Sequence, residues 1–260
     1  MSEHVMAALV VVLAWWASTG VVLRLVWMAP RTRPVSVGAL SILGLLGLYV
    51  VHRTAHLTTE LGAYVAFGGA LAAWAWHELV FLLGWITGPR REACPPEARG
   101  LRRFRYATAT LIHHEVVLAA TFALVVALTW RAPNQVASLT FGVLWVMRLS
   151  AKFNVYFGVR NLTEEFVPPH LRYLTSYFTR AAMNPLMPVS LLAGTAGVAV
   201  LAHNALAPAA DGFGVTGYTL VATILTLAVV EHLCLVLPLP DAWLWRWVVK
   251  DLRQEARQDV

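Results

Sequence analysis

Residues 215–237 read VTGYTLVATILTLAVVEHLCLVL, an apolar run interrupted near its end by the adjacent pair Glu231 and His232. A helix needs about 20 mainly apolar residues to cross the hydrocarbon core of a bilayer, and this run has the required length. We therefore predict a membrane-spanning helix that carries an acid and an imidazole inside the membrane.

Further stretches of the same kind lie at 5–28, 36–57, 62–87, 105–130, 136–158 and 186–206. The chain is 58% hydrophobic and only 13% charged, with a mean hydropathy of +0.63, which excludes an ordinary soluble domain. The sequence predicts an all-α, multi-pass bundle of about seven transmembrane helices. Residues 1–240 form this single domain, and residues 241–260 form an amphipathic cytoplasmic tail that lies on the inner leaflet.

Arginine gathers in the loops at one end of the predicted bundle, and cytoplasmic loops are enriched in arginine and lysine. We therefore predict a periplasmic N-terminus and a cytoplasmic C-terminus. The net charge of +6 suits a protein whose cations face the anionic cytoplasmic leaflet, where each is attracted to lipid by about 1 kcal/mol. A nucleic-acid partner is therefore not needed to explain it. The deciding loop holds Arg90, Arg91, Arg99, Arg102, Arg103 and Arg105.

A layer of ionisable side chains is predicted at a common depth within these helices. Counting from the expected helix ends at about 1.5 Å per residue places the groups roughly 9 to 16 Å from the inner face. Buried charges are costly unless they are paired, ligated or wetted, so the layer is a candidate functional site. Its members are His77, Glu78, His113, His114, Glu115, Arg148, Lys152, Glu231 and His232.

Carboxylates and imidazoles on several helices are the ligands of two-metal centres in helical bundles. The chain offers adjacent pairs instead of the Glu-x-x-His spacing that places both ligands on one face, so we expect one or two ligands per helix. The candidate metal ligands are His77, Glu78, His114, Glu115, Glu231 and His232, with Arg148 and Lys152 as catalytic residues.

A structural interpretation competes with the metal site. Arg148 and Lys152 can pair with Glu78, Glu115 and Glu231, which leaves a formal charge of minus one that a protonated histidine would cancel. Both interpretations stay open at this point.

A second polar stripe is predicted toward the other membrane face, where His52, His56 and Glu60 recur every four residues. It can be an additional metal or proton-conducting group, although an interfacial, hydrogen-bonded role is favoured. A pigment with a central metal needs a single histidine as axial ligand; any of the nine histidines could serve, and we choose His113 as the candidate.

Several motifs, in this order, resemble the PuhE family of photosynthetic complex assembly proteins from purple phototrophic bacteria. The likeness covers the helices from residue 62 onward and the tail. The motifs are WHELVFLLGWITGPR at 76–90, His114-Glu115, APNQ at 132–135, RLSAKFN at 148–154, NLTEEF at 161–166, Glu231-His232 and VLPLPD at 236–241.

The resemblance implies a multi-pass protein of the bacterial inner membrane, encoded near the reaction-centre H subunit and needed for accumulation of reaction centre and core antenna. Two hypotheses follow. An assembly factor would handle bacteriochlorophyll or nascent subunits. A membrane iron-dependent oxidoreductase or hydroxylase would act on a hydrophobic pigment, carotenoid or quinone precursor, with Arg148 and Lys152 orienting the substrate.

Overall fold

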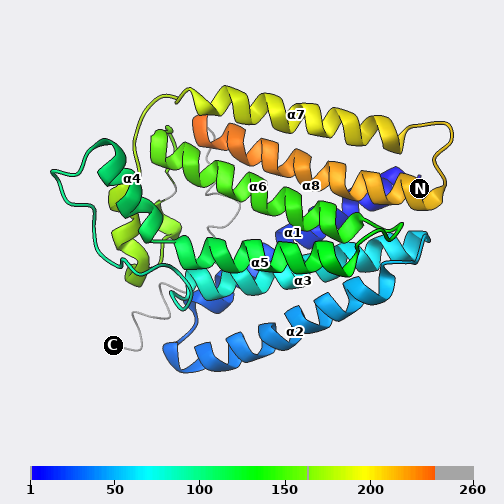
Figure 1. Ribbon diagram of the computed structural model, residues 1–260, viewed down its shortest axis with the longest axis horizontal. Helices are drawn as coiled ribbons and strands as arrows, with labels where there is room; N and C mark the ends of the chain where they lie inside the picture. Colours follow the sequence, from blue (N-terminus) through cyan, green and yellow to red (C-terminus); the bar gives the residue numbers. More distant parts are fainter. Residues whose placement is uncertain (1, 163, 238–260) are drawn as a thin grey trace.

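The computed structural model describes residues 2–162 and 164–237, and these residues fold into a bundle of helices (Figure 1). An isolated parallel bridge joins Val159 to Arg180. The predicted all-α class is confirmed, while the predicted tail, 241–260, lies outside the described residues. The helices are α1 (Glu3–Trp27), η1 (Pro30–Thr32), α2 (Arg33–Thr54), α3 (Glu60–Leu82), α4 (Gly100–Ala109), α5 (Ile112–Leu128), α6 (Val136–Phe157), η2 (Glu164–Phe166), η3 (Pro169–Tyr177), α7 (Leu186–Ala205) and α8 (Gly212–Val236).

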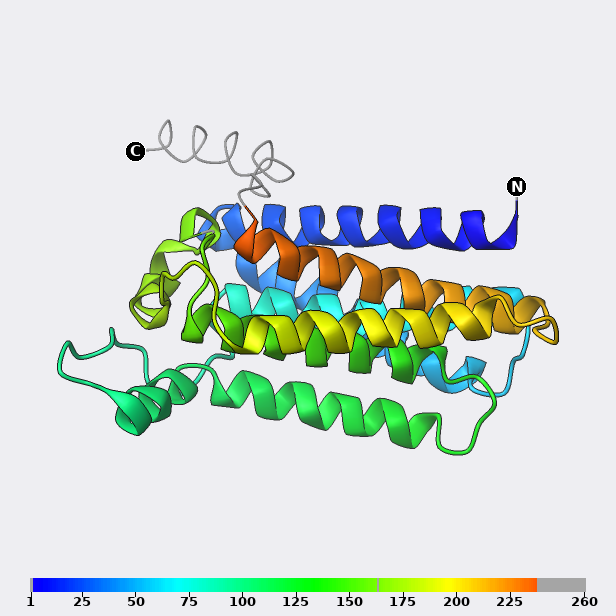
Figure 2. The ribbon, with the colours of Figure 1, turned by 90° about the horizontal axis from the view of Figure 1, so that it is seen from above.

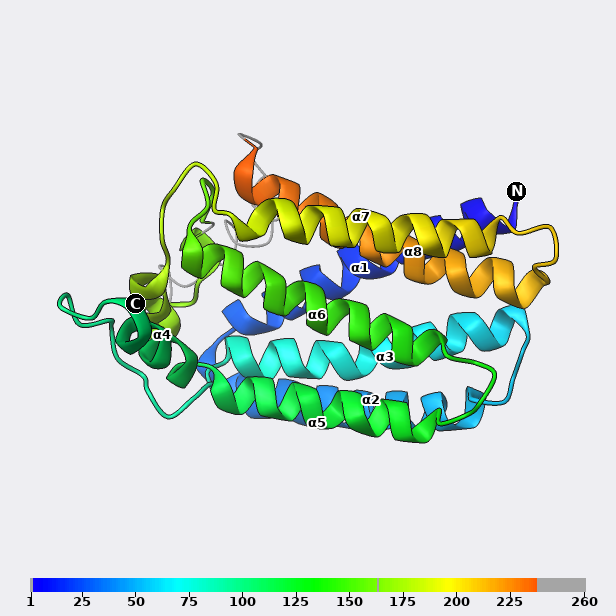
Figure 3. The ribbon, with the colours of Figure 1, turned by 45° about the horizontal axis from the view of Figure 1, so that its top comes forward.

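Within the described residues, 6 helices are long and apolar enough to cross a membrane, and the bent pair of α4 and α5 brings the number to 7. The long helices run side by side, with α4 at one end of the bundle (Figures 1 and 3). Helix α7 packs on α8, and α2 packs on α3. The chain is therefore a multi-pass membrane protein.

The main core lies where α1, α2, α3, α5, α6 and α8 meet. Its largest fully buried side chains include Phe67, Leu118, Phe141 and Leu220. Helix α5 forms one outer side of the bundle (Figure 2). Because α6 contacts α3, α5, α7 and α8, polar groups on α6 can reach several helices.

Glycines bring α2 and α3 into backbone contact. A Cβ atom on Gly47 would lie 2.6 Å from the carbonyl oxygen of Gly69, and one on Gly69 would lie 2.8 Å from the carbonyl oxygen of Gly47. Small residues permit this close approach, which membrane helices use in place of a hydrophobic driving force.

Helix α3 ends at Leu82, earlier than the predicted end at residue 87. Gly84 has a φ of 76° and follows the helix. The backbone N–H of Gly84 donates to Phe81, and that of Trp85 donates to Val80, which is a Schellman ending. The predicted end was too late because the residues that follow Leu82 are also apolar and continue the hydropathy pattern.

The predicted span 105–130 is formed by two helices instead of one, because the chain bends by 63° between α4 and α5. The turn of residues 83–88 packs against this bend, where a Cβ on Gly88 would lie 2.2 Å from the carbonyl oxygen of Ala109. The hydroxyl of Thr110 also donates to the carbonyl of Ala107, at 2.7 Å. These contacts bend the chain without a proline.

Candidate functional site

Two ion pairs connect α6 to its neighbours inside the bundle. Arg148 Nη2 lies 2.7 Å from Glu78 Oε2 on α3, and Lys152 Nζ lies 2.5 Å from Glu115 Oε1 on α5. Arg148 and Lys152 are four residues apart on α6 and so share one face. The structure thus brings four of the predicted site residues together in pairs.

The Lys152–Glu115 pair is the more enclosed of the two. Side-chain exposure is 19% for Lys152 and 12% for Glu115, against 42% for Arg148 and 13% for Glu78. Trp145 Nε1 donates to the other oxygen of Glu115, at 3.2 Å. Lys152 Nζ also lies 5.3 Å from the centre of the Phe81 ring. Both oxygens of Glu115 therefore have partners on α6.

A hydrogen-bonded chain joins α6 to α7 and α8. The ring of His232 contacts Ser150 Oγ through Nε2 at 3.0 Å and the Ala228 carbonyl through Nδ1 at 2.8 Å. Ser150 Oγ also lies 2.9 Å from Ser190 Oγ of α7. Asn154 donates to the same Ser190 hydroxyl, at 3.0 Å. His232 is therefore placed by hydrogen bonds on both ring nitrogens.

His77 and His114 lie in the interior beside each other, with ring centres 6.4 Å apart. His77 Nε2 contacts Thr121 Oγ1 of α5 at 3.0 Å. The ring of His114 packs on Phe81, with centres 4.5 Å apart, and is fully buried. Neither ring nitrogen of His114 has a hydrogen-bond partner among the described residues.

Glu231 is exposed, and its charge interacts with that of Arg148 on α6. Trp15 Nε1 of α1 donates to its Oε1, at 3.2 Å. The hydrogen bond connects α1 to α8, which also pack against each other along their lengths.

The carboxylates Glu78 and Glu115 of this arrangement have cationic partners in the same chain. Within the described residues, no group of three or more His, Cys, Asp or Glu is placed to hold a metal ion. The predicted metal ligands and the predicted catalytic roles of Arg148 and Lys152 therefore stay predictions.

The layer lies nearer the helix ends than expected. His77 is about five residues from the end of α3, or roughly 8 Å, and His114 is in the first turn of α5. The earlier end of α3 and the bend before α5 account for this difference.

The predicted second stripe does not lie on one helix face. Helix α2 ends at Thr54 and α3 begins at Glu60, so His52, His56 and Glu60 fall on two helices and the turn between them. All three are exposed. His113 is exposed as well, on the outer side of α5, and its pigment-binding role stays a prediction.

The loops at the α4 end are joined by arginine. Arg90 Nε donates to the hydroxyl of Tyr177 at 2.8 Å, and this hydrogen bond raises the pKa of the Arg90 guanidinium. Arg103 Nη2 donates to the Tyr177 carbonyl at 2.8 Å and to Thr179 Oγ1 at 3.1 Å. Some of the basic residues thus hold loops in place.

Comparison with known proteins gives a family for this architecture. The model of a family described as "Protein of unknown function (DUF3623)" matches residues 1–256. The chain belongs to the DUF3623 family. A relative from Rhodobacter capsulatus, "Uncharacterized 30.4 kDa protein in puhA 5'region", is 36% identical over 263 residues, which cover 98% of this chain and 94% of the relative. No solved structure matches the chain.

The motifs quoted from the sequence include structural residues whose roles were not predicted. Within APNQ, the Asn134 amide donates to the carbonyls of Thr54, Leu57 and Gly62, at 3.1 to 3.2 Å, and so fixes the turn between α2 and α3. Asn154 of RLSAKFN accepts a hydrogen bond from Asn184, at 3.0 Å. In the sequence, Asn154 is recognisable only as a polar amide within an apolar run, which indicates that it needs hydrogen-bond partners inside the bundle.

Proposed function

We propose that this protein is an assembly factor for the photosynthetic reaction centre and core light-harvesting antenna, in the inner membrane of a phototrophic bacterium. One observation carries the proposal: the relative from Rhodobacter capsulatus, similar over nearly the whole chain, is described by its place in the puhA 5' region. The resemblance to the PuhE family supports the same process.

The geometry favours a role in binding partners. The charges of Glu78 and Glu115 are matched by Arg148 and Lys152, so these groups connect helices. The outer surface, by contrast, carries large exposed apolar side chains. They include Trp16, Tyr49, Trp85 and Trp130. Rings of this kind suit contact with a pigment or with the helix of a nascent subunit.

Deletion of the gene, with both pigments and complexes measured, tests this function. We expect scarce reaction centre and core antenna, seen as reduced near-infrared absorbance of membranes, together with ordinary pigment intermediates by chromatography. The full chain supplied from a plasmid should restore the complexes. Accumulation of a pigment, carotenoid or quinone precursor would contradict the assembly role and favour an enzyme.

The second candidate is a membrane metal-dependent oxidoreductase or hydroxylase, and one observation favours it. His114 is fully buried with both ring nitrogens lacking a described partner, and Glu78 Oε1 and His77 Nδ1 are also buried without one. Buried polar groups nearly always find a partner, so these atoms are candidates for contact with a bound group.

Metal analysis of detergent-purified protein separates the two candidates. Stoichiometric iron that is lost in His114→Ala, and retained in an exposed control, His203→Ala, would favour the enzyme. We expect metal below stoichiometric amounts in both variants and in the parent protein, because Glu78 and Glu115 are paired with cations.

A further inference from the structure

Helix α4 is placed as an interfacial helix. The bend of 63° before α5 means that α4 lies across the end of the bundle when α5 stands upright in the membrane. Exposed Leu101 and Arg105 give α4 both apolar and cationic surface, which is typical of a helix at the boundary of headgroups and acyl chains.

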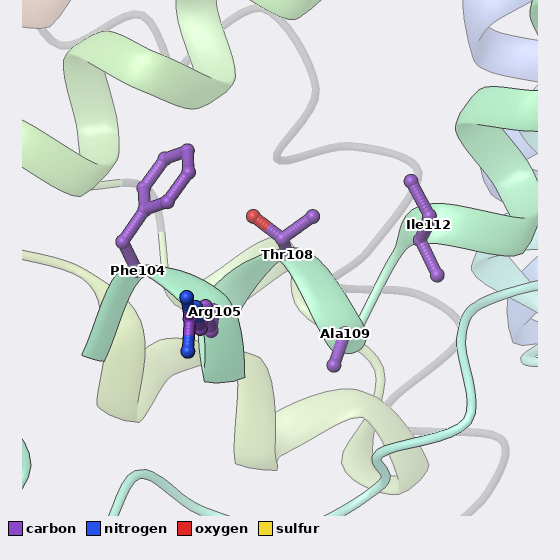
Figure 4. Close-up of a pocket in the computed structure, with 5 residues that line it drawn as sticks. All are labelled: Phe104, Arg105, Thr108, Ala109 and Ile112. Atoms are coloured by element: carbon purple, nitrogen blue, oxygen red, sulfur yellow. The ribbon is translucent and has the colours of Figure 1, made fainter. Parts of the chain in front are cut away.

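A shallow, open cavity of about 290 Å³ lies at this bend, where residues of α4 and α5 line it (Figure 4). Its lining is mainly apolar and combines the last turns of α4 with the first residue of α5. The lining residues are Phe104, Arg105, Thr108, Ala109 and Ile112. The cavity therefore lies where a membrane-spanning helix begins.

Aromatic packing fixes the wall of this cavity. The Phe104 ring stacks on Phe153 with centres 6.4 Å apart and meets Tyr156 edge-on at 5.8 Å. Arg103 lies over the Tyr156 ring, with its guanidinium carbon 4.6 Å from the ring centre. Phe104, one of the five lining residues, is thus held in place by two residues of α6.

Arg105 is a cation available to a ligand. It is exposed, and within residues 2–162 and 164–237 the structure gives it no hydrogen bond or ion pair. Arg102 lies one turn earlier on α4 and donates through Nη2 to the Glu97 carbonyl, at 2.9 Å. Arg105 therefore places positive charge at the edge of an apolar cavity, while the Arg102 guanidinium is bound to a loop carbonyl.

We infer that this cavity binds an anionic phospholipid, with its phosphate on Arg105 and an acyl chain against Phe104, Thr108 and Ile112. Arginine pairs with phosphate through charge-assisted hydrogen bonds. A soluble anion would not use the apolar lining, so charge and shape together favour a lipid. Bound lipid would fill the bend and hold α4 against the membrane. The inference is independent of the proposed assembly role.

Native mass spectrometry of the purified full-length protein tests the inference. Phosphatidylglycerol and phosphatidylcholine of the same chain length are titrated in detergent, and bound lipid is counted. We expect one preferential site for phosphatidylglycerol. Arg105→Gln should weaken it about fivefold, the effect of losing one membrane-surface charge contact. Arg91→Gln, an exposed cation of the same loop region, is the matched control and should leave affinity unchanged.

A second variant, Thr108→Trp, fills the cavity without changing charge and should also weaken binding, with helical content checked by circular dichroism. If that variant does not fold, the comparison of Arg105→Gln with Arg91→Gln decides. Equal loss in both arginine variants, equal binding of the two lipids, or displacement by inorganic phosphate would overturn the inference.

Discussion

At the scale of single residues, polar groups inside the bundle are matched to partners on other helices. Asn184, just before α7, shows the principle most fully. Its amide nitrogen donates to Asn154 Oδ1 at 3.0 Å and to the Gly158 carbonyl at 2.9 Å, and its Oδ1 accepts from the backbone of Leu186 at 2.9 Å. One side chain thus fixes the end of α6 and the start of α7.

Replacing Asn184 with alanine should lower stability by roughly 2 kcal/mol, because acceptors at Asn154 and Gly158 would be left buried without a donor. Thermal unfolding of purified protein in detergent measures the effect. Asn204→Ala is the control, since among the described residues the Asn204 amide donates to Val200 of its own helix. Equal unfolding temperatures for the two variants would contradict this account.

At the scale of helices, the close contact of α2 with α3 depends on two glycines, Gly47 and Gly69, which have no side chain. A Cβ on Gly47 would also lie 3.0 Å from the Cβ of Ala72, so both backbone and side chain of α3 exclude it. The two helices would have to move apart to admit a methyl group.

Gly47→Ala should therefore destabilise the protein by about 1–3 kcal/mol, the usual cost of overpacking. Gly38→Ala, on the same helix, is the matched control, because its Cβ meets nothing within 4 Å. Chemical denaturation in detergent compares the two. A larger loss of stability in Gly38→Ala than in Gly47→Ala would contradict this role of Gly47.

At the scale of the whole molecule, membrane topology follows from the helices and the arginines. The start of α1 and the end of α8 lie at opposite ends of the bundle (Figure 1). A chain that starts on one side of the membrane and ends on the other crosses it an odd number of times. Among the described residues, six helices qualify as spans by themselves, so α5 must be the seventh.

Reporter fusions test this topology. Green fluorescent protein joined to the C-terminus should fluoresce, and alkaline phosphatase joined there should be inactive, because the arginine-rich end is predicted to face the cytoplasm. A phosphatase inserted in the turn before Gly212 should be active. The reverse pattern would contradict the predicted orientation.

The sequence predicted the class of fold and several members of the layer for a physical reason. An apolar run of spanning length is unambiguous, and an ion such as Glu115 or Lys152 within such a run needs a partner. It could not predict the bend at Thr110, where no proline or glycine interrupts the helix. Nor could it identify Trp145 or Ser150 as partners, since such residues are ordinary in a membrane helix.

The central claim is that charges of the layer act as pairs between helices, and the Lys152–Glu115 pair tests it most directly. Either Glu115→Gln or Lys152→Met leaves one enclosed charge unmatched, which costs about 3 kcal/mol or more. Changing both removes that penalty while the helices remain in contact.

The decisive measurement is the amount of reaction centre and core antenna in a deletion strain that carries each single variant or the double variant. We predict that both single variants lose the complexes and that the double variant restores most of them. A double variant as defective as the singles would contradict the account, because each residue would then act independently of the other, as a catalytic group or a metal ligand would.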